Sequence, residues 1–264
     1  MTLLQLAVLA VVQGFTEFLP ISSSGHLVLA PVVMGWPDQG LMLDVAVHVG
    51  TLGAVVVYLW RDLWMMVVDI FRAFAGRRGP GLKLAAYIVV ATIPVIIAGL
   101  ALKTAVPAGI RSAEVIGWSF IVFGVVLYLA DRFGMTVRKI EHLSWAGAIY
   151  IGLAQVLALI PGASRSGTTI TMARVLGMER REAARFSMML SIPAILGAGV
   201  LEGKALLDSG DLALQATVVM AAGMAFVAAL VAIVAMMGWL RHASYTPFVI
   251  YRVVVGAAIL YLFV

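Results

Sequence analysis

The chain has no cysteine, which excludes disulfide bonds and thiolate metal sites. Charged residues are also scarce: they make up 12% of the 264 residues, against about 25% in an ordinary soluble domain. Hydrophobic residues make up 63%, and the mean hydropathy is +1.07. This composition excludes a soluble globular domain and indicates an integral membrane protein.

The net charge of +5 does not indicate a nucleic-acid-binding protein. Lys and Arg fall in short loops between apolar segments, where they determine the orientation of a membrane protein. We therefore expect no nucleic-acid partner. The apolar segments are too long for barrel strands, which are about ten residues each with alternating polarity. The chain is therefore predicted to span the membrane as helices, with an all-α fold.

Six apolar segments are long enough to cross a bilayer as helices. They are residues 41–60, 84–102, 115–130, 186–201, 212–240 and 246–264. Shorter apolar segments flank two polar motifs, and each of these segments is too short to cross the bilayer. We therefore expect two re-entrant helical hairpins, at residues 1–35 and 143–180. Such hairpins are tolerated at membrane depth only where protein or water covers the backbone.

The basic loops at residues 61–83 and 132–139 lie on the same side of this arrangement, which the positive-inside rule makes cytoplasmic. Each half of the chain then has one hairpin and three crossings. The first half covers about 1–135 and the second about 143–264. Because three is odd, the second half is inverted relative to the first. We expect one membrane domain over 1–264, built as an inverted-topology repeat.

Four identities at a constant offset of 142 residues support this repeat. They are Gln13 with Gln155, Ser22 with Ser164, Ser24 with Ser166, and Gly25 with Gly167. All four fall on or beside the two polar motifs. In inverted-repeat membrane proteins, broken helices meet near the midplane and form the binding site. We therefore expect residues 22–26 and 164–169 to face each other.

The two motifs contain one carboxylate, Glu17, one imidazole, His26, one guanidinium, Arg165, and several hydroxyls. A charged side chain at the bilayer centre costs about 2.5 to 3.5 kcal/mol on insertion scales, so these groups need partners, water or a ligand. Arg165 can clamp phosphate oxygens, and nearby hydroxyls can add hydrogen bonds. Glu17 can hold a divalent cation or act as a base, and His26 titrates near neutral pH. This inventory indicates a phosphate site.

Other interpretations of these residues remain open. Glu17 and Arg165 can form a structural ion pair between the repeats, and the serines can be packing residues. Asp44 and His48 are four residues apart on one helical face, which suits metal ligands but more often marks interfacial anchors. The motif around Arg165 is not a P-loop, because Thr168 stands where that motif has Lys, and no nucleotide is implied.

Residues 17–26 (EFLPISSSGH) and 161–167 (PGASRSG) resemble the two signature motifs of the undecaprenyl-diphosphate phosphatase family, also called the bacitracin-resistance protein family. The resemblance extends to residues 44–52 and to the number of spans, so it covers essentially the whole chain. It implies a multi-pass enzyme of the bacterial inner membrane whose active site faces the outer, periplasmic side. The implied fold is six transmembrane helices plus two re-entrant hairpins, which agrees with the topology above.

The implied activity is hydrolysis of undecaprenyl diphosphate to undecaprenyl phosphate and inorganic phosphate. This reaction recycles the lipid carrier for cell-wall synthesis and gives bacitracin resistance. The expected partners are the polyprenyl diphosphate lipid and the bilayer, and a homodimer is a candidate assembly. The alternative is a polyprenyl-phosphate flippase or secondary transporter that uses the same anion-binding site. A flippase has no chemical use for a serine, a histidine and a carboxylate placed together.

The resemblance also implies the roles of individual residues. The catalytic candidates are Glu17, Ser23, His26 and Arg165. From the phosphate-site argument above, the substrate-binding candidates are Gln13, Ser22, Ser24, Ser164, Ser166, Gly167 and Thr168. The implied cofactor is a divalent cation, Mg²⁺ or Ca²⁺, held by Glu17 with Gln13 as a second candidate ligand. Many members carry Glu at the position of Gln13, so here the diphosphate itself is expected to supply most ligands.

The sequence leaves the nucleophile open. If Ser23 attacks the phosphorus, His26 or Glu17 must accept its proton. If His26 attacks, a phosphohistidine forms and Ser23 becomes a hydrogen-bonding partner. The two residues are three apart, so one helical turn would place both on one face.

Overall fold

The computed structural model describes residues 2–37, 39–105, 112–209 and 211–264, and within them the regular structure is helical apart from one isolated bridge between Arg138 and Met178. The predicted all-α class is therefore confirmed. The helices are α1 (Leu3–Thr16), α2 (Ser23–Met34), α3 (Leu41–Tyr58), α4 (Trp60–Phe74), α5 (Pro80–Ala105), α6 (Ala113–Phe133), η1 (Ile140–His142), α7 (Trp145–Val156), η2 (Leu157–Leu159), α8 (Arg165–Val175), α9 (Arg180–Ser209), α10 (Leu212–Trp239) and α11 (Thr246–Phe263).

Four helical segments are long and apolar enough to cross a membrane. They are Pro80–Leu102, Ala113–Phe133, Leu214–Trp239 and Thr246–Phe263. The pair Met42–Tyr58 and Trp60–Phe74, bent by 77°, adds a fifth if it is counted as one span. The predicted span 186–201 lies inside α9, which is not among these candidates in the described part of the chain. The protein is thus a multi-pass membrane protein with four or five candidate spans.

The segment after α3 was predicted to be a loop, but much of it is helical. α3 ends at Tyr58, and after Leu59 the chain continues as α4 at a 77° bend. α4 carries Asp62 and Arg72 near its two ends, so it is less apolar than α3. Its apolar side chains Trp64 and Phe71 are largely exposed. The basic residues expected in this loop are therefore partly on a helix.

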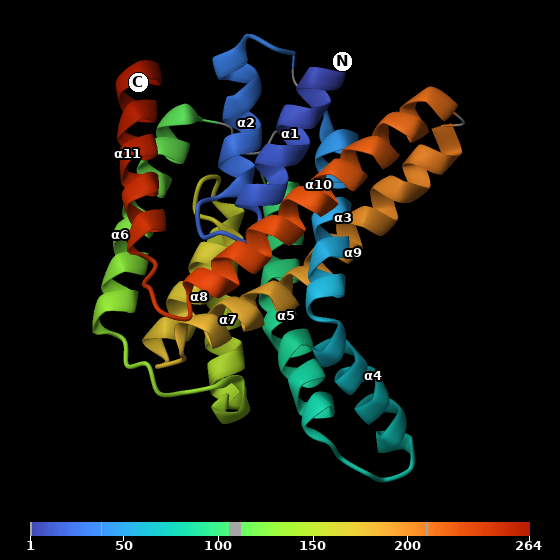
Figure 1. The fold of residues 1–264 in the computed structure, drawn as a ribbon, viewed down its shortest axis with the longest axis vertical. Coiled ribbons are helices and arrows are strands. Elements are labelled where there is room, and N and C mark those ends of the chain that lie inside the picture. The colour runs from blue at the N-terminus through green and yellow to red at the C-terminus, as the bar shows by residue number, and fades with distance from the viewer. Residues whose placement is uncertain (1, 38, 106–111, 210) are drawn as a thin grey trace.

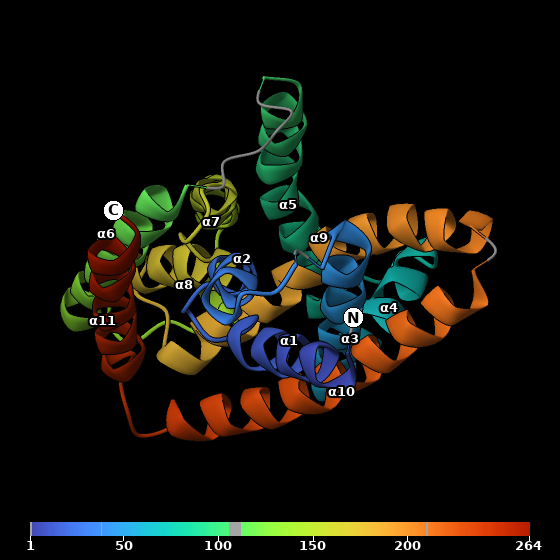
Figure 2. The ribbon, with the colours of Figure 1, turned by 90° about the horizontal axis from the view of Figure 1, so that it is seen from above.

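The two polar motifs join pairs of short helices, as the hairpin prediction required. The turn 17–22 connects α1 to α2, and the turn 160–164 follows α7 and η2 and leads into α8 (Figure 1). Both members of each pair pack against each other. Seen from above, α2 and α8 lie near the centre of the molecule and the long helices surround them (Figure 2). The two turns are therefore enclosed by protein.

The packing partners of the two pairs correspond. α1 packs against α10, and α7 packs against α5. Glycine allows both close approaches: a Cβ atom added to Gly14 would lie 2.8 Å from the carbonyl oxygen of Ala225 on α10, and one added to Gly152 would lie 2.6 Å from that of Ala91 on α5. α3 also packs against α9, and α6 packs against α11. Each short pair thus leans on a long helix from the other half of the chain.

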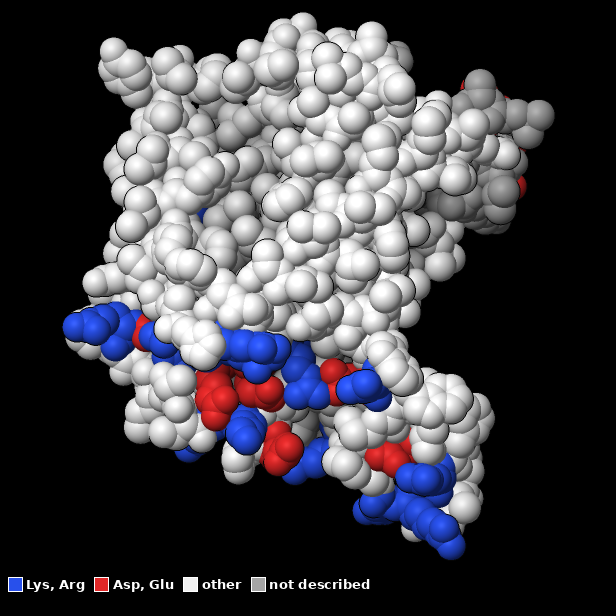
Figure 3. Space-filling view, in the orientation of Figure 1, with Lys and Arg blue, Asp and Glu red and all other residues white. Residues whose placement is uncertain are grey.

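Charged side chains gather at one end of the molecule, the lower part of Figure 3. There the buried Arg174 donates from Nε to Oδ1 of Asp131 at 3.0 Å, and Arg180 donates to the same oxygen at 2.8 Å. The backbone N–H of Tyr245 donates to Oδ2 of Asp131 at 3.1 Å. This cluster ties together α6, α8, the start of α9 and the start of α11. It lies at the end that the sequence assigns to the cytoplasm.

Candidate active site

A serine precedes the second helix of each short pair in the same unusual conformation. Ser22 has a φ of 71° and Ser164 a φ of 75°, and within the described residues no other non-glycine residue has a positive φ. Each serine caps its helix: Oγ of Ser22 accepts from the N–H of Gly25 at 3.4 Å, and Oγ of Ser164 accepts from the N–H of Gly167 at 3.0 Å. Such a cap is worth about 1 kcal/mol, which helps to offset the left-handed backbone.

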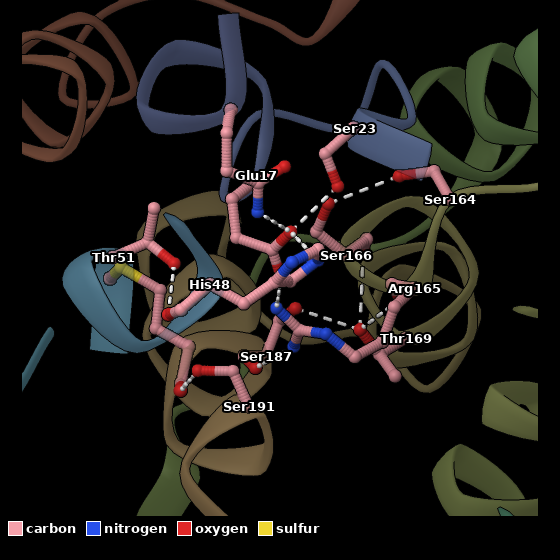
Figure 4. A network of polar contacts seen from close by, with 12 residues as sticks. Glu17, Ser23, His48, Thr51, Ser164, Arg165, Ser166, Thr169, Ser187 and Ser191 are labelled. Carbon is pink, nitrogen blue, oxygen red and sulfur yellow. Dashed lines mark hydrogen bonds and ion pairs between the residues drawn. The ribbon is translucent and has the colours of Figure 1, made fainter. Parts of the chain in front are cut away.

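Glu17 lies where the two turns meet (Figure 4). Its carboxylate is buried and accepts hydrogen bonds at both oxygens. Arg165 donates from Nη2 to Oε1 at 2.9 Å. Ser23 donates from Oγ to Oε2 at 2.6 Å, and Gln13 donates from Nε2 to Oε2 at 2.9 Å. The expectation that the two motifs face each other is met at this contact.

Arg165 has a second fixed contact, because its Nη1 donates to the carbonyl oxygen of Ser187 on α9 at 2.9 Å. The neighbouring Ser166 donates from Oγ to the carbonyl oxygen of Leu19 at 2.9 Å and so links the two turns directly. The hydroxyls of Thr169 and Ser187 lie 2.7 Å apart. Figure 4 shows Arg165 reaching Glu17 from the α8 side. The guanidinium is therefore held in one orientation by partners on α1's turn and α9.

A cavity of about 370 Å³ opens beside these contacts. Its lining residues are Glu17, Ser23, Ser24, Asp44, Val45, His48, Ala158, Ser164, Arg165, Ala194 and Ile195. The imidazole of His48 reaches Glu17, with Nε2 lying 3.5 Å from Oε2. The sequence favours interfacial anchors over metal ligands for Asp44 and His48, but both line the cavity wall. The four-residue spacing on one helical face was the signal that could have ranked them higher.

His26 does not line this cavity, although it belongs to the same motif. Its Nδ1 lies 2.7 Å from the carbonyl oxygen of Ser22, and its Nε2 lies 2.6 Å from the hydroxyl of Tyr251 on α11. The imidazole also stacks on the Tyr251 ring at a centroid distance of 5.6 Å and packs against Phe120. Both ring nitrogens thus have partners. The structure turns Ser23 towards Glu17 and His26 towards α11.

The remaining substrate-binding candidates divide into two groups. Ser24 and Ser164 line the cavity. The others support the turns: Ser22 and Gly167 take part in the caps, Ser166 bonds to Leu19, Thr168 donates to the carbonyl oxygen of Arg165 at 3.1 Å, and Gln13 bonds to Glu17. Of the residues predicted from the sequence as catalytic or substrate-binding, the cavity wall therefore contains one acid, one guanidinium and three serines.

Arg252 was missed by the sequence analysis, although it is an ionisable residue inside a predicted span. It is fully buried on α11 and has no ion pair within the described residues. Its guanidinium donates to five carbonyl oxygens instead, at distances of 2.9 to 3.1 Å. These belong to Pro20 in the first turn, Gly162 and Ala163 in the second, and Ser119 and Phe120 on α6. Arg252 thus connects the two turns to each other and to α6.

Comparison with known proteins shows which family the chain belongs to. A family model described as "Bacitracin resistance protein BacA" matches residues 6–258. The chain belongs to the bacitracin resistance protein family. In this family member, the two polar motifs form the two turns that meet at Glu17 and Arg165.

Named relatives match over nearly their full length. Undecaprenyl-diphosphatase 1 of Rhodospirillum rubrum is 49% identical over 98% of this chain and 95% of its own. Undecaprenyl-diphosphatases of Jannaschia sp. and Dinoroseobacter shibae are 49% and 50% identical over 98% of both chains. The resemblance seen in the two motifs is therefore confirmed for the whole chain.

Proposed function

We propose that this member of the bacitracin resistance protein family hydrolyses undecaprenyl diphosphate to undecaprenyl phosphate and inorganic phosphate. The reaction recycles the lipid carrier for cell-wall synthesis and gives bacitracin resistance. Family membership and the names of the relatives support this activity. The structural observation that carries it is the contact of Ser23 and Arg165 with opposite oxygens of the Glu17 carboxylate inside one cavity.

Ser23 is the nucleophile in this proposal, because its hydroxyl faces the cavity and donates to Glu17 at 2.6 Å. Oγ of Ser23 attacks the terminal phosphorus, and its proton passes to Oε2 of Glu17. The bond from phosphorus to the bridging oxygen breaks, and undecaprenyl phosphate leaves. Water then attacks the phosphoserine, inorganic phosphate is released, and Ser23 regains its proton.

Arg165 binds the diphosphate and stabilises the charge that develops on the transferred phosphoryl group. Its contact with the Ser187 carbonyl fixes the guanidinium before substrate arrives. Ser24 and Ser164 line the same cavity and can donate hydrogen bonds to phosphate oxygens. α2 and α8 both begin here, and the positive ends of their dipoles favour an anion.

His26 contributes by positioning the first turn rather than by attack. Its Nδ1–H donates to the carbonyl oxygen of Ser22, the residue before Ser23, and its Nε2 accepts from the Tyr251 hydroxyl. A nucleophilic imidazole would need that second nitrogen free. The arrangement therefore favours Ser23 over His26 for the attacking role.

The residues present suit a divalent cation that arrives with the substrate better than one held by protein alone. Within the described residues no group of three His, Cys, Asp or Glu side chains could hold a metal ion. Of the two carboxylates that line the cavity, Glu17 is the one bonded to Ser23 and Arg165, and Oε1 of the buried Gln13 has no hydrogen-bond partner in the described part. We propose Mg²⁺ or Ca²⁺ held by Glu17, with Gln13 beside it and diphosphate oxygens completing the shell. When bound, the cation would neutralise phosphate charge.

The architecture we propose is six transmembrane helices plus two re-entrant hairpins in an inverted-topology repeat, within one domain. Three observations support it. Ser22 and Ser164 share one conformation at the predicted offset, the short pairs pack on long helices of the opposite half, and charged side chains gather at one end. We further propose the bacterial inner membrane, with the cavity open to the periplasmic side. A homodimer and the lack of a nucleic-acid partner stay predictions.

The activity is tested by phosphate release from a C55 polyprenyl diphosphate, with purified protein in detergent, with and without EDTA. Ser23→Ala, Glu17→Gln and Arg165→Ala are each expected to abolish most turnover, and His26→Gln to reduce it less. Turnover that persists in the first three variants would contradict the assignment and leave the transport alternative to be tested. Inhibition by EDTA would support the cation.

Orientation can be tested cleanly because the chain has no cysteine. A membrane-impermeant maleimide should label Ser24→Cys in intact spheroplasts, since Ser24 is exposed in the cavity. It should label Arg241→Cys, at the charged end, only after the membrane is permeabilised. The reverse pattern would place the cavity on the cytoplasmic side.

A further inference from the structure

His48 has its two ring nitrogens in different roles. Nδ1 lies 2.6 Å from the carbonyl oxygen of Asp44, one helical turn earlier on α3. A carbonyl oxygen only accepts, so Nδ1 carries a proton. Nε2 lies 3.5 Å from Oε2 of Glu17 and faces the cavity (Figure 4). In the neutral imidazole, the lone pair of Nε2 is therefore directed towards a carboxylate oxygen.

Two acceptors placed this close repel unless a positive group lies between or beside them; Arg165 is bonded to Oε1, and a cation between Nε2 and the carboxylate would serve both acceptors. Metal-ligating histidines have this arrangement, because they usually donate the other ring N–H to a backbone carbonyl or a carboxylate, which fixes the ring. The distance also fits: two donor atoms that each lie about 2.1 Å from one ion, and 3.5 Å from each other, subtend about 110° at the ion. One cation can therefore reach both Nε2 of His48 and the carboxylate of Glu17.

Glu17 has room for such a contact. A carboxylate offers about four lone-pair sites. Arg165, Ser23 and Gln13 occupy three of them. The free site is on Oε1, because Ser23 and Gln13 both bond to Oε2, so a cation shared with His48 uses Oε1 or replaces one of those two donors. No third His, Asp or Glu joins these two residues in a ligand cluster within the described ranges, so phosphate oxygens and water must fill the other positions.

We propose that His48 is a nitrogen ligand of the divalent cation in this site, sharing it with Glu17. The inference rests on the proposed phosphatase function in one respect, since the diphosphate completes the coordination. An imidazole ligand raises the affinity for first-row transition ions relative to Mg²⁺ and Ca²⁺. The chain therefore binds Mn²⁺ more tightly than Mg²⁺, and replacing His48 by an oxygen donor reduces that preference.

The test uses the full chain in detergent with Mn²⁺, alone and with methylenediphosphonate as a headgroup that cannot be hydrolysed. Pulsed electron paramagnetic resonance reports a directly bound ¹⁴N nucleus, and calorimetry gives the Kd for Mn²⁺ and Mg²⁺. His48→Gln should remove the nitrogen coupling and reduce the preference for Mn²⁺ over Mg²⁺ by about tenfold. His26→Gln is the matched control, because it removes an imidazole that does not line the cavity.

A nitrogen coupling in the wild type that survives His26→Gln and disappears in His48→Gln supports the proposal. Three results would overturn it: Mn²⁺ binding without a nitrogen coupling, a coupling that persists in His48→Gln, or no Mn²⁺ binding even with the diphosphonate. In the last case His48 would simply pair with Glu17 as an imidazolium. Folding of His48→Gln is checked independently by its Mg²⁺ binding and elution volume. A bound nitrogen in a protein without phosphatase turnover would refute the proposed activity but not this ligand.

Discussion

The hydroxyl of Ser23 lies 2.6 Å from Oε2 of Glu17, although the two residues are on opposite sides of a proline-containing turn. In the proposed mechanism this contact couples the nucleophile to its base. We expect Ser23→Ala to lower kcat by about 10³-fold or more, as loss of a nucleophile does in other covalent catalysts. The measurement is phosphate release at saturating lipid.

The matched control is Ser24→Ala, the next residue after Ser23 in the first turn of α2. Ser24 lines the cavity, but its hydroxyl is 3.4 Å from Ser22 and does not reach Glu17. Its removal should lower kcat/KM by less than about tenfold, the cost of one neutral hydrogen bond. Equal losses in the two variants would argue against a special role for Ser23.

The chemical stability of a trapped intermediate separates Ser23 from His26. With labelled substrate and a rapid acid quench, we expect an adduct that survives acid, because phosphoserine is acid-stable and phosphohistidine is not. The adduct should persist in His26→Gln and vanish in Ser23→Ala. An acid-labile adduct that depends on His26 would require the imidazole to leave its bond with Tyr251 and would reverse the assignment.

Arg165 should not tolerate replacement by lysine. One guanidinium contacts both the Glu17 carboxylate and the Ser187 carbonyl at 2.9 Å, and a single ammonium cannot reproduce that planar fork. We expect Arg165→Lys to lower kcat/KM by about 10²-fold and Arg165→Ala by about 10³-fold or more. If lysine restores wild-type kinetics, the positive charge alone would be sufficient.

Arg252 should be critical for stability. Arg252→Met removes five donors from buried carbonyl oxygens in the two turns and α6, and we expect a loss of about 3 kcal/mol or more in the free energy of unfolding. SDS titration of the purified protein measures this change. Arg241→Met, which removes an exposed arginine between α10 and α11, should change the free energy of unfolding by less than about 0.5 kcal/mol.

The positive φ of Ser164 gives an unusual ranking of substitutions. Ser164→Ala keeps the strained backbone and loses the cap to Gly167, whereas Ser164→Gly loses the cap but relieves the strain. Glycine should therefore be the milder change by about 1 kcal/mol in unfolding free energy. Since both variants lack the hydroxyl, their activities should fall together. A more stable alanine variant would show that this backbone conformation carries little cost.

Much of the site could be predicted from the sequence, because polar groups inside apolar segments have few physical solutions. Glu17 and Arg165 needed each other or a ligand, and the structure places them 2.9 Å apart. The offset of 142 residues also predicted that Ser22 and Ser164 would be equivalent, and their φ values of 71° and 75° agree. Both results follow from the cost of charge and unpaired backbone in lipid.

Other features depended on geometry that spacing does not encode. Ser23 and His26 are three residues apart, but the start of α2 directs Ser23 to Glu17 and His26 to Tyr251. The position of His48 depends on how α3 packs beside the first turn. The bend at Leu59 converts an expected loop into α4. Arg252 could have been recognised, since an arginine within a predicted span needs partners, but its carbonyl partners come from three distant segments.

Arg252 donates only to main-chain carbonyl oxygens. This set of hydrogen bonds therefore depends on the backbone positions of the two turns and α6, and not on the identity of the side chains there. Side chains in the tips of the two hairpins can therefore be substituted without loss of the Arg252 hydrogen bonds, provided that the backbone carbonyl groups do not move. Substitutions at these tips can therefore change the selectivity for the substrate headgroup while the backbone arrangement that aligns the two turns is preserved.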